Sequence, residues 1–343
     1  MNLKSCVCTS AFLGLVVLLI LAMVTAGCTG TGKTTTPATT VVPTQATTAA
    51  QTPLGTVTYQ AVATTAQAST PAPAATTSAS TGEKESIKVS GSTTVLPIAQ
   101  AAAQAYMAAH PEADIQITGG GSGVGVQQIG QKTVDIGMSS RELTSDEMKK
   151  YPDLVKSVIA KDGIAIIVNP ANTISVISAQ NVKDIYTGKF TKWSQVYGAN
   201  VPNTNQAIVV IGRDSASGTR TFFDSDPTGF LHGAAPVKTM LQMNSNGAVA
   251  QNVAQTPGAI GYVSIGFVSS DVKALPLWYN DPSKAVAATA QNVTDKSYPA
   301  NRELFMFTNS APTGLAKDFI DFIKSPAGQK IVVDQGYVAL NGS

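Results

Sequence analysis

The sequence repeats one local pattern three times: a strand-like run leads into a loop of Gly, Ser and Thr, and a helical stretch follows the loop. The loops are residues 91–97 (GSTTVLP), 119–125 (GGGSGVG) and 212–220 (GRDSASGTR). Each loop offers hydroxyl donors and free backbone N–H groups at the positive end of a helix. A single loop of this kind also suits an ordinary helix cap. Three of them together predict an oxyanion site, provided that the helix starts converge.

The regions between and after these loops alternate between strand-like and helical patterns. The strand-like runs are residues 87–89, 114–118, 134–138, 163–169, 207–211 and 258–263. The apolar run GIAIIVN at 163–169 is typical of a strand that is buried on both faces. Residues 315–323 carry apolar side chains at helical spacing and predict a packing helix. The alternation predicts an α/β fold with mainly parallel sheets flanked by helices.

The first 28 residues have the composition of an export signal. Lys4 precedes an uncharged apolar run, residues 11–26, which is short for a membrane-spanning helix and normal for a signal peptide. The run ends in TAGC, which is similar to a lipobox in which cleavage leaves Cys28 to be lipidated, although Thr25 stands where Leu is usual. The alternative is an uncleaved N-terminal anchor. Both interpretations place the rest of the chain outside the cytoplasm, tethered to the cell membrane.

Residues 29–82 differ in composition from residues 83–343. Thr, Ala, Pro, Gln and Ser dominate, with Lys33 as the one charged residue and Tyr59 as the one aromatic residue. Such a segment cannot bury enough apolar surface to order itself, so we predict a flexible stalk. Residues 27–34 (GCTGTGKT) match the phosphate-loop pattern formally. They lack the preceding strand and following helix that this motif requires, so we predict no nucleotide site there.

Composition excludes several classes of function. All three cysteines (Cys6, Cys8 and Cys28) lie near the N-terminus, and the two histidines, His110 and His232, are far apart. We therefore expect no disulfide framework, no metal, no cofactor and no enzymatic activity in the folded region. Charged residues make up 13% of the chain and the net charge is +2, without the basic stripe that nucleic-acid binding needs. We expect a monomer.

Six segments in order resemble the phosphate-binding proteins of Pst-type ABC transporters. They are SGSTTVLP, GGGSGVGVQQI, TVDIGMSSREL, GRDSASGTRTFF, GAIGYVSIGF and SPAGQKIVVDQGYV, which together span most of residues 86–343. The resemblance implies the type II periplasmic-binding-protein fold, in which two lobes are joined by two strand crossings. Inorganic phosphate would bind between the lobes and pass to permease and ATPase subunits. We expect one lobe to comprise residues 83–165 and 265–343, and the other to comprise 166–264.

The resemblance assigns phosphate contacts to the three loops. These contacts are Thr94 and Val95, with Thr93 as an alternative, then Ser122, and then Arg213, Ser217, Gly218 and Thr219. The Arg213 guanidinium would provide a charged, bidentate donor. Its alternative role is an ion pair with Asp214.

One position departs from the family pattern. Many members have an aspartate after the strand that corresponds to residues 134–138, and it accepts the proton of hydrogen phosphate. Here Ser140 stands in its place, followed by Arg141, which could add positive charge at the anion or pair with Glu142. Without this acid, the site has less basis for excluding sulfate, so we expect weaker selectivity for phosphate over sulfate. A binder of another tetrahedral oxyanion (sulfate, molybdate or tungstate) and a phosphate-responsive surface sensor or adhesin of the same fold remain alternatives.

Overall fold

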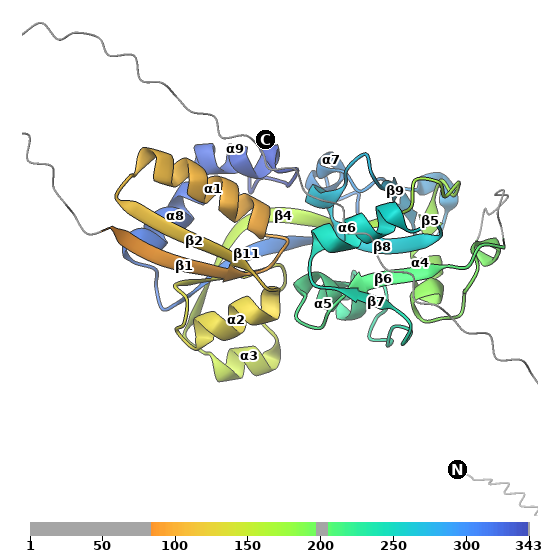
Figure 1. The fold of residues 1–343 in the computed structure, drawn as a ribbon, viewed down its shortest axis with the longest axis horizontal. Helices are drawn as coiled ribbons and strands as arrows, with labels where there is room; N and C mark the ends of the chain where they lie inside the picture. The colour runs from red at the N-terminus through yellow and green to blue at the C-terminus, as the bar shows by residue number, and fades with distance from the viewer. Residues whose placement is uncertain (1–83, 197–204, 342–343) are drawn as a thin grey trace, which may run out of the picture. The chain divides into compact units, whose positions relative to one another are not determined.

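The computed structural model describes residues 84–196 and 205–341 (Figure 1). The expected export signal with Cys28, and the expected stalk of residues 29–82, lie outside the described residues. Within the described part of the chain, no helix has the length and apolar character needed to cross a membrane.

Most strands belong to one continuous sheet. The strands are β1 (Glu85–Gly91), β2 (Ala113–Gly119), β3 (Ile136–Ser139), β4 (Leu154–Val168), β5 (Ile177–Ser178), β6 (Val209–Arg213), β7 (Leu241–Met243), β8 (Ala259–Ser264), β9 (Lys273–Leu275), β10 (Leu277–Trp278) and β11 (Asn301–Asn309). The sheet order is β2-β1-β3-β11-β4-β8-β6-β7, with β9 also paired to β4, and β5 pairs with β10. β1 is parallel to β2 and β3, and β6 is parallel to β7 and β8. The predicted α/β class is confirmed.

Helices cover this sheet. They are α1 (Leu96–Ala109), α2 (Ser122–Gly130), α3 (Ser145–Lys150), α4 (Ala179–Tyr186), α5 (Gly218–Ser225), α6 (Asn246–Gln255), α7 (Ala290–Thr294), α8 (Gly314–Lys324) and α9 (Pro326–Asp334). Short 3-10 turns occupy Trp193–Gln195, Ile265–Phe267 and Pro282–Lys284. The expected packing helix is α8, which buries Leu315, Phe319 and Ile323 because they recur on one side of the helix.

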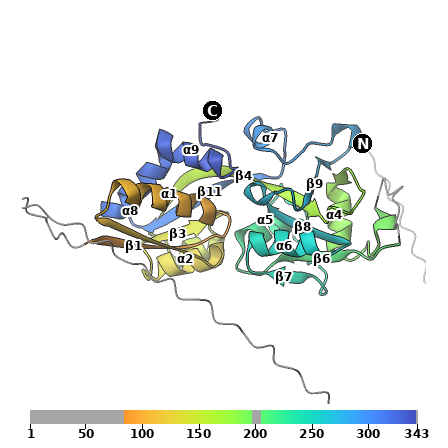
Figure 2. The ribbon, with the colours of Figure 1, turned by 45° about the horizontal axis from the view of Figure 1, so that its top comes forward.

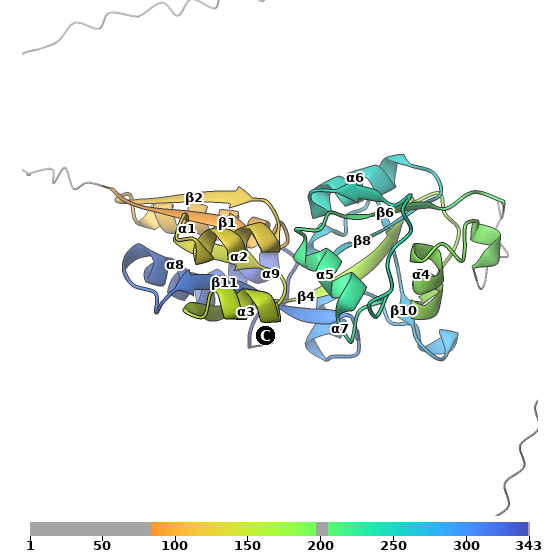
Figure 3. The same ribbon diagram turned by 90° about the horizontal axis from the view of Figure 1, so that it is seen from below.

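Strand β4 joins the two halves of the sheet. It pairs with β11 as far as Gly163 and with β8 from Ile164 onward. Figures 1 and 3 show β4 running from the elements around β1 and β2 to those around β6 and β8, with β11 beside its first part. Residues 164–168 are fully buried, as expected for an apolar strand that is covered on both faces. The described chain thus has two lobes joined through β4 and β11, which is the architecture that the resemblance implied.

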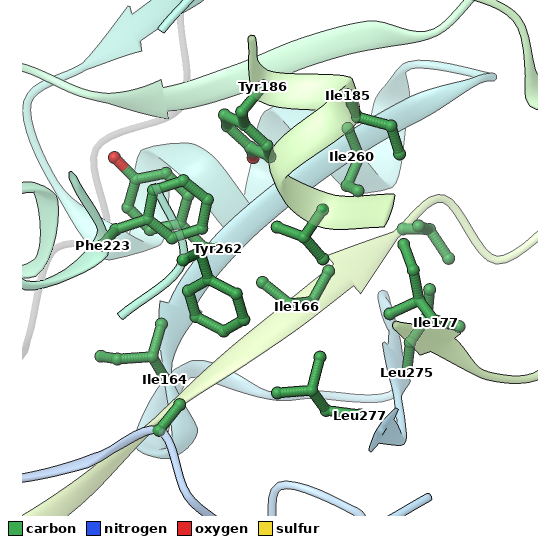
Figure 4. Packing of buried hydrophobic residues seen from close by; sticks show 14 of the residues in the cluster. Ile164, Ile166, Ile177, Ile185, Tyr186, Phe223, Ile260, Tyr262, Leu275 and Leu277 are labelled. Atoms are coloured by element: carbon green, nitrogen blue, oxygen red, sulfur yellow. The ribbon is translucent and has the colours of Figure 1, made fainter. Parts of the chain in front are cut away.

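Each lobe has its own apolar core. In the first lobe, α1 and α8 pack on the sheet through residues such as Ile98 and Phe319. In the second lobe, Phe223 stacks on Tyr262 with ring centroids 3.9 Å apart, next to Tyr186 (Figure 4). Figure 2 shows α1, α2 and α8 with the first lobe, and α4, α5 and α6 with the second.

The segment after β8 differs from the sequence-based expectation, which placed residues 265–343 in the first lobe. β9 pairs with β4 beyond the crossing, and Val293 and Tyr298 belong to the core of the second lobe. Figure 4 shows Leu275 and Leu277 in that same core. The chain therefore packs on the second lobe until Ala300, and it returns to the first lobe with β11.

Candidate anion-binding site

The three predicted loops open α1, α2 and α5, and the structure brings these helix starts together. The N–H of Gly123, in the first turn of α2, donates to the carbonyl of Ala216 in the third loop (2.9 Å). This contact joins the first lobe to the second, so the lobes are closed against each other. Gly125 permits α2 to lie directly on the ends of β1 and β3. A Cβ there would lie 2.7 Å from the Ser90 carbonyl oxygen and 2.6 Å from that of Met138.

Two threonine hydroxyls from opposite lobes meet at the centre of the site. Oγ1 of Thr94, which lies just before α1, is 3.1 Å from Oγ1 of Thr219 in the first turn of α5. Both residues are 1% exposed. Thr93, the alternative, has its Oγ1 3.4 Å from the Asn246 amide nitrogen and does not reach Thr219 by any described hydrogen bond. The geometry therefore favours Thr94 as the central hydroxyl of the first loop. Val95, which precedes α1, is fully buried beside it.

Ser122 and Ser140 form a second pair of hydroxyls. The backbone N–H of Ser140 donates to Ser122 Oγ (3.0 Å), and the two Oγ atoms are 3.2 Å apart. Gly218, at the start of α5 in the other lobe, lies so near that a Cβ there would be 2.3 Å from Ser122 Oγ. Ser217 caps α5 by accepting a bond from the Arg220 N–H (3.1 Å). The hydroxyl hydrogen of Ser217 is thus left for another acceptor.

Arg213 ends β6 and is 1% exposed. Its Nε donates to the Met243 carbonyl (3.1 Å) and its Nη2 to the Asn244 carbonyl (3.2 Å). Its Nη1 is buried and has no hydrogen-bond partner among the described residues. The alternative ion pair with Asp214 is not among the ion pairs of the described residues. Burial lowers the pKa of Arg213 to about 10, so the side chain remains charged at neutral pH.

Arg141 is engaged away from the four hydroxyls. Its Nη1 and Nη2 donate to the two carboxylate oxygens of Glu147 (2.6 and 2.8 Å), and Nη1 also donates to the Glu142 carbonyl. Glu147 in turn accepts the N–H of Thr144 and completes the capping box of α3. Of the two roles left open for Arg141, the structure has an ion pair, with Glu147 as the partner instead of Glu142.

Two residues that the sequence analysis did not single out lie at the centre of the site. Arg302 of β11 is 9% exposed and forms an ion pair with the fully buried Asp162 of β4, through Nε (3.0 Å) and Nη2 (2.8 Å). Nη2 of Arg302 also donates to Thr219 Oγ1 (2.9 Å) and Thr94 Oγ1 (3.3 Å). Burial raises the pKa of Asp162, and the adjacent guanidinium opposes this shift. Neither residue belongs to a loop, so no local motif indicated them.

Asn246 is a third residue that the sequence analysis missed. Its amide nitrogen donates to Thr94 Oγ1 (3.0 Å), and its amide oxygen accepts the Ser264 N–H (3.3 Å), which sets the orientation of the amide. Asn246 begins α6, directly after β7 and the Asn-Ser pair at 244–245. This is a fourth strand–loop–helix junction. Its Ser, Asn and Gly residues are of the same types as those of the other three loops, so the sequence could have predicted this loop as part of the site.

The chemistry of the site is that of a donor cluster. Four hydroxyls, two guanidinium groups and several helix N-termini come together in a buried place, and both Asp162 oxygens are already hydrogen-bonded. Such a site suits an anion that accepts hydrogen bonds in many directions. No group of His, Cys, Asp and Glu residues in the described ranges is arranged to hold a metal ion.

Comparison with known proteins agrees with this geometry. A family model described as the PBP superfamily domain matches residues 72–327, which places the chain in that superfamily of binding proteins. The phosphate-binding protein PstS of Bacillus subtilis is 36% identical over 255 residues, covering 74% of this chain and 80% of the relative. The chain therefore belongs to the PstS family of phosphate-binding proteins, and the resemblance predicted from its motifs is confirmed.

Solved structures support the same assignment. A Clostridium perfringens protein assigned as a phosphate ABC transporter substrate-binding protein, solved with bound phosphate, is 32% identical with a TM-score of 0.67. The alignment covers 75% of this chain and all of that one. An ABC-type phosphate transport receptor from Vibrio cholerae is 31% identical with a TM-score of 0.59, covering 74% of this chain and all of the other.

Proposed function

We propose that this protein captures inorganic phosphate between its two lobes outside the cytoplasm and delivers it to the permease and ATPase subunits of an ABC importer. One observation carries the proposal: the buried hydroxyls of Thr94 and Thr219, one from each lobe, are in hydrogen-bond contact. The guanidinium groups of Arg302 and Arg213 lie nearby. The relatives and the solved structures named above are phosphate-binding proteins or transport receptors, which supports phosphate as the anion. The role is binding without catalysis.

In this proposal the loops provide the donors around one phosphate ion. Hydroxyl donors come from Thr94, Ser122, Ser140, Ser217 and Thr219. Backbone N–H donors come from Val95, Gly218 and Thr219 at the helix starts, and Arg213 provides charge through its unpaired Nη1. Thr93 supports the first loop, and Arg141 holds the chain after Ser140 through its ion pair with Glu147.

Phosphate would bind by lobe closure. We propose a first lobe of residues 84–163 and 301–341, and a second lobe that begins at residue 164 and ends at residue 300. Ser122 and Ser140 lie in the first lobe, whereas Arg213 and Gly218 lie in the second. Only the closed arrangement brings all of these donors to one anion, so the anion stabilises the closed state through contacts that the open state lacks.

Calorimetry of the Arg213→Ala variant tests the site. A charge-assisted hydrogen bond contributes about 1.5–3 kcal/mol, so loss of the guanidinium should weaken phosphate binding about 10- to 150-fold. Circular dichroism should show an unchanged fold. Phosphate binding close to the wild-type value would reject the assignment of Arg213. Wild-type protein that does not bind phosphate would reject the proposed function itself.

A second candidate ligand is sulfate, because Ser140 carries no charge at the position where an acid would face the anion. Ser140 can accept the proton of hydrogen phosphate, but it does not repel an anion that has no proton. Competition calorimetry with phosphate and sulfate distinguishes the two. Equal affinity would make this a general binder of tetrahedral oxyanions.

We also propose that the N-terminal segment anchors the protein to the membrane, through lipidated Cys28 or as an uncleaved anchor. The composition of residues 1–28 supports this proposal, and the stalk of residues 29–82 would let the binding lobes reach the permease. Mass spectrometry of the N-terminal peptide tests the lipid. A peptide that begins at Cys28 with added acyl mass is expected. We propose that the protein acts as a monomer, which light scattering would test.

A further inference from the structure

Arg302 occupies the place where the two lobes join. It lies at the start of β11, directly opposite Asp162 in the antiparallel register with β4. The Asp162 carboxylate is held from its other side by the Ser264 hydroxyl (2.6 Å) and the Ile265 N–H (3.3 Å). Since four donors hold this buried carboxylate, Asp162 fixes the Arg302 side chain in one orientation.

That orientation places Nη2 of Arg302 between hydroxyls of both lobes. Thr94 Oγ1 accepts from Arg302 Nη2 and from the Asn246 amide, neither of which can act as an acceptor. Arg302 Nη2 carries two hydrogens for three acceptors, Asp162, Thr219 and Thr94, so its longer bond to Thr94 shares a hydrogen. The bond between Thr94 Oγ1 and Thr219 Oγ1 uses one hydroxyl hydrogen. At least one hydroxyl hydrogen of the pair therefore remains for a ligand.

The remaining nitrogen of Arg302 has no partner. Its Nη1 is buried without a hydrogen bond among the described residues, as is Nη1 of Arg213. The two guanidinium groups are near enough for the charge of Arg302 to disfavour the charge of Arg213. Asp162 balances the charge of Arg302, whereas Arg213 has no ion pair among the described residues, and each guanidinium group has an unpaired Nη1. An anion in contact with both groups would satisfy them together.

We propose that Arg302 is a second anion-binding guanidinium, carried by a strand that joins the lobes and oriented by Asp162. It acts on the ligand directly through Nη1, and its Nη2 donates to Thr219 and Thr94, whose pair keeps a hydroxyl hydrogen for the ligand. This inference rests on the proposed function, because it concerns the same site. The inference adds a ligand contact from β11, one of the two strands that join the lobes, to the contacts that the loops provide.

The test compares the two halves of the ion pair. Phosphate titrations of the full chain would be run with wild type, Arg302→Gln, Asp162→Asn and the double variant Arg302→Gln/Asp162→Asn. We expect Arg302→Gln and the double variant to bind phosphate about 10- to 150-fold more weakly, because a charge-assisted bond is lost. Asp162→Asn should weaken phosphate binding less than Arg302→Gln does, because the arginine loses its fixed orientation but keeps its charge for the anion.

A purely structural ion pair predicts a different pattern. Breaking it from either side leaves an unpaired buried charge, so Arg302→Gln and Asp162→Asn would weaken phosphate binding equally. The double variant, which leaves no unpaired charge, would then bind like wild type. Either result would overturn the inference. The exposed ion pair of α9, changed by Lys330→Gln/Asp334→Asn, removes the same formal charges and should leave binding unchanged.

Two further results keep the inference separate from the proposed function and from folding. If wild type does not bind phosphate, the proposed function fails first. If the variants do not fold, a crystal structure of wild type with inorganic phosphate decides the question. Arg302 Nη1 within hydrogen-bond distance of a phosphate oxygen is expected, and Nη1 turned away from the phosphate would overturn the assignment.

Discussion

Gly218 packs directly against the other lobe, and adding one methyl group there should prevent full closure. Gly218 is the first residue of α5 in the second lobe. A Cβ on Gly218 would lie 2.3 Å from Ser122 Oγ, 2.7 Å from Ser140 Oγ and 2.9 Å from Ser122 Cβ. The two serines belong to the first lobe. The Gly218→Ala substitution therefore opposes closure without touching the core of either lobe.

The magnitude follows from these distances. Carbon atoms at van der Waals contact are about 3.5–4.0 Å apart, so the lobes must separate by roughly 1 Å. The serine hydroxyls cannot simply rotate away, because Ser122 Oγ accepts the Ser140 N–H and the nearby Ser122 Cβ cannot rotate. Overpacking of this kind costs about 1–3 kcal/mol, which corresponds to about 5- to 150-fold weaker phosphate binding. The open state does not have this clash, so unliganded stability should not fall.

Titration calorimetry with phosphate measures the effect, and thermal unfolding in the absence of phosphate checks the fold. Gly247→Ala is the matched control. Gly247 lies in α6 of the same lobe, and a Cβ there would meet only Phe267, at 3.9 Å. The Gly247→Ala variant should bind phosphate with the same affinity as wild type. If Gly218→Ala also binds within about twofold of wild type, the lobes do not close on the anion in the way that the structure indicates.

Three further predictions address charge, capping and selectivity. Because burial lowers the pKa of Arg213 to about 10, phosphate affinity should fall as pH rises through that value and recover on return to pH 8, as calorimetry would show. The stability contribution of Arg213 should change in the opposite direction, rising above pH 10 because the unfolded chain then binds the extra proton. Thr144→Ala removes the capping box of α3 and should cost about 1 kcal/mol in urea unfolding, with phosphate affinity unchanged. Ser140→Asp adds a carboxylate beside Ser122 and should weaken sulfate binding more than phosphate binding, measured by competition.

Sequence reasoning found the parts of the site that local patterns determine. Thr94, Ser122 and Thr219 lie in loops where a strand ends and a helix begins, and residue type alone marks such positions as donors. Asn246 lies in a fourth loop of this kind and was within reach of the same reasoning. The strand before it, β7, has only three residues, which is too few for a periodic signal, so this junction was harder to recognise from the sequence.

Arg302 and Asp162 could not be found in this way. Their contact depends on the register between β4 and β11, and 140 residues of chain separate them. A charged residue at the start of a strand is ordinarily read as a surface residue, and only the tertiary fold buries this one. The same limit explains the misplaced segment after β8. β9 and β10 have three and two residues, which is too short for a periodic signal, so no local pattern indicated that this segment stays on the second lobe.

Both groups of residues, those found from local patterns and those found only in the structure, act on the same equilibrium between the open and the closed lobes. In the proposed site, the loops bring neutral hydroxyls and N–H groups to the anion, and these groups can be hydrated when the lobes are open. Arg213 and Arg302 are different, because in the closed arrangement each has a buried Nη1 without a partner among the described residues and the two like charges lie near one another. Closure without an anion therefore costs free energy, and closure around an anion regains it. A ligand shifts such an equilibrium only through its differential affinity for the two states, and in this proposal the two guanidinium groups provide that difference.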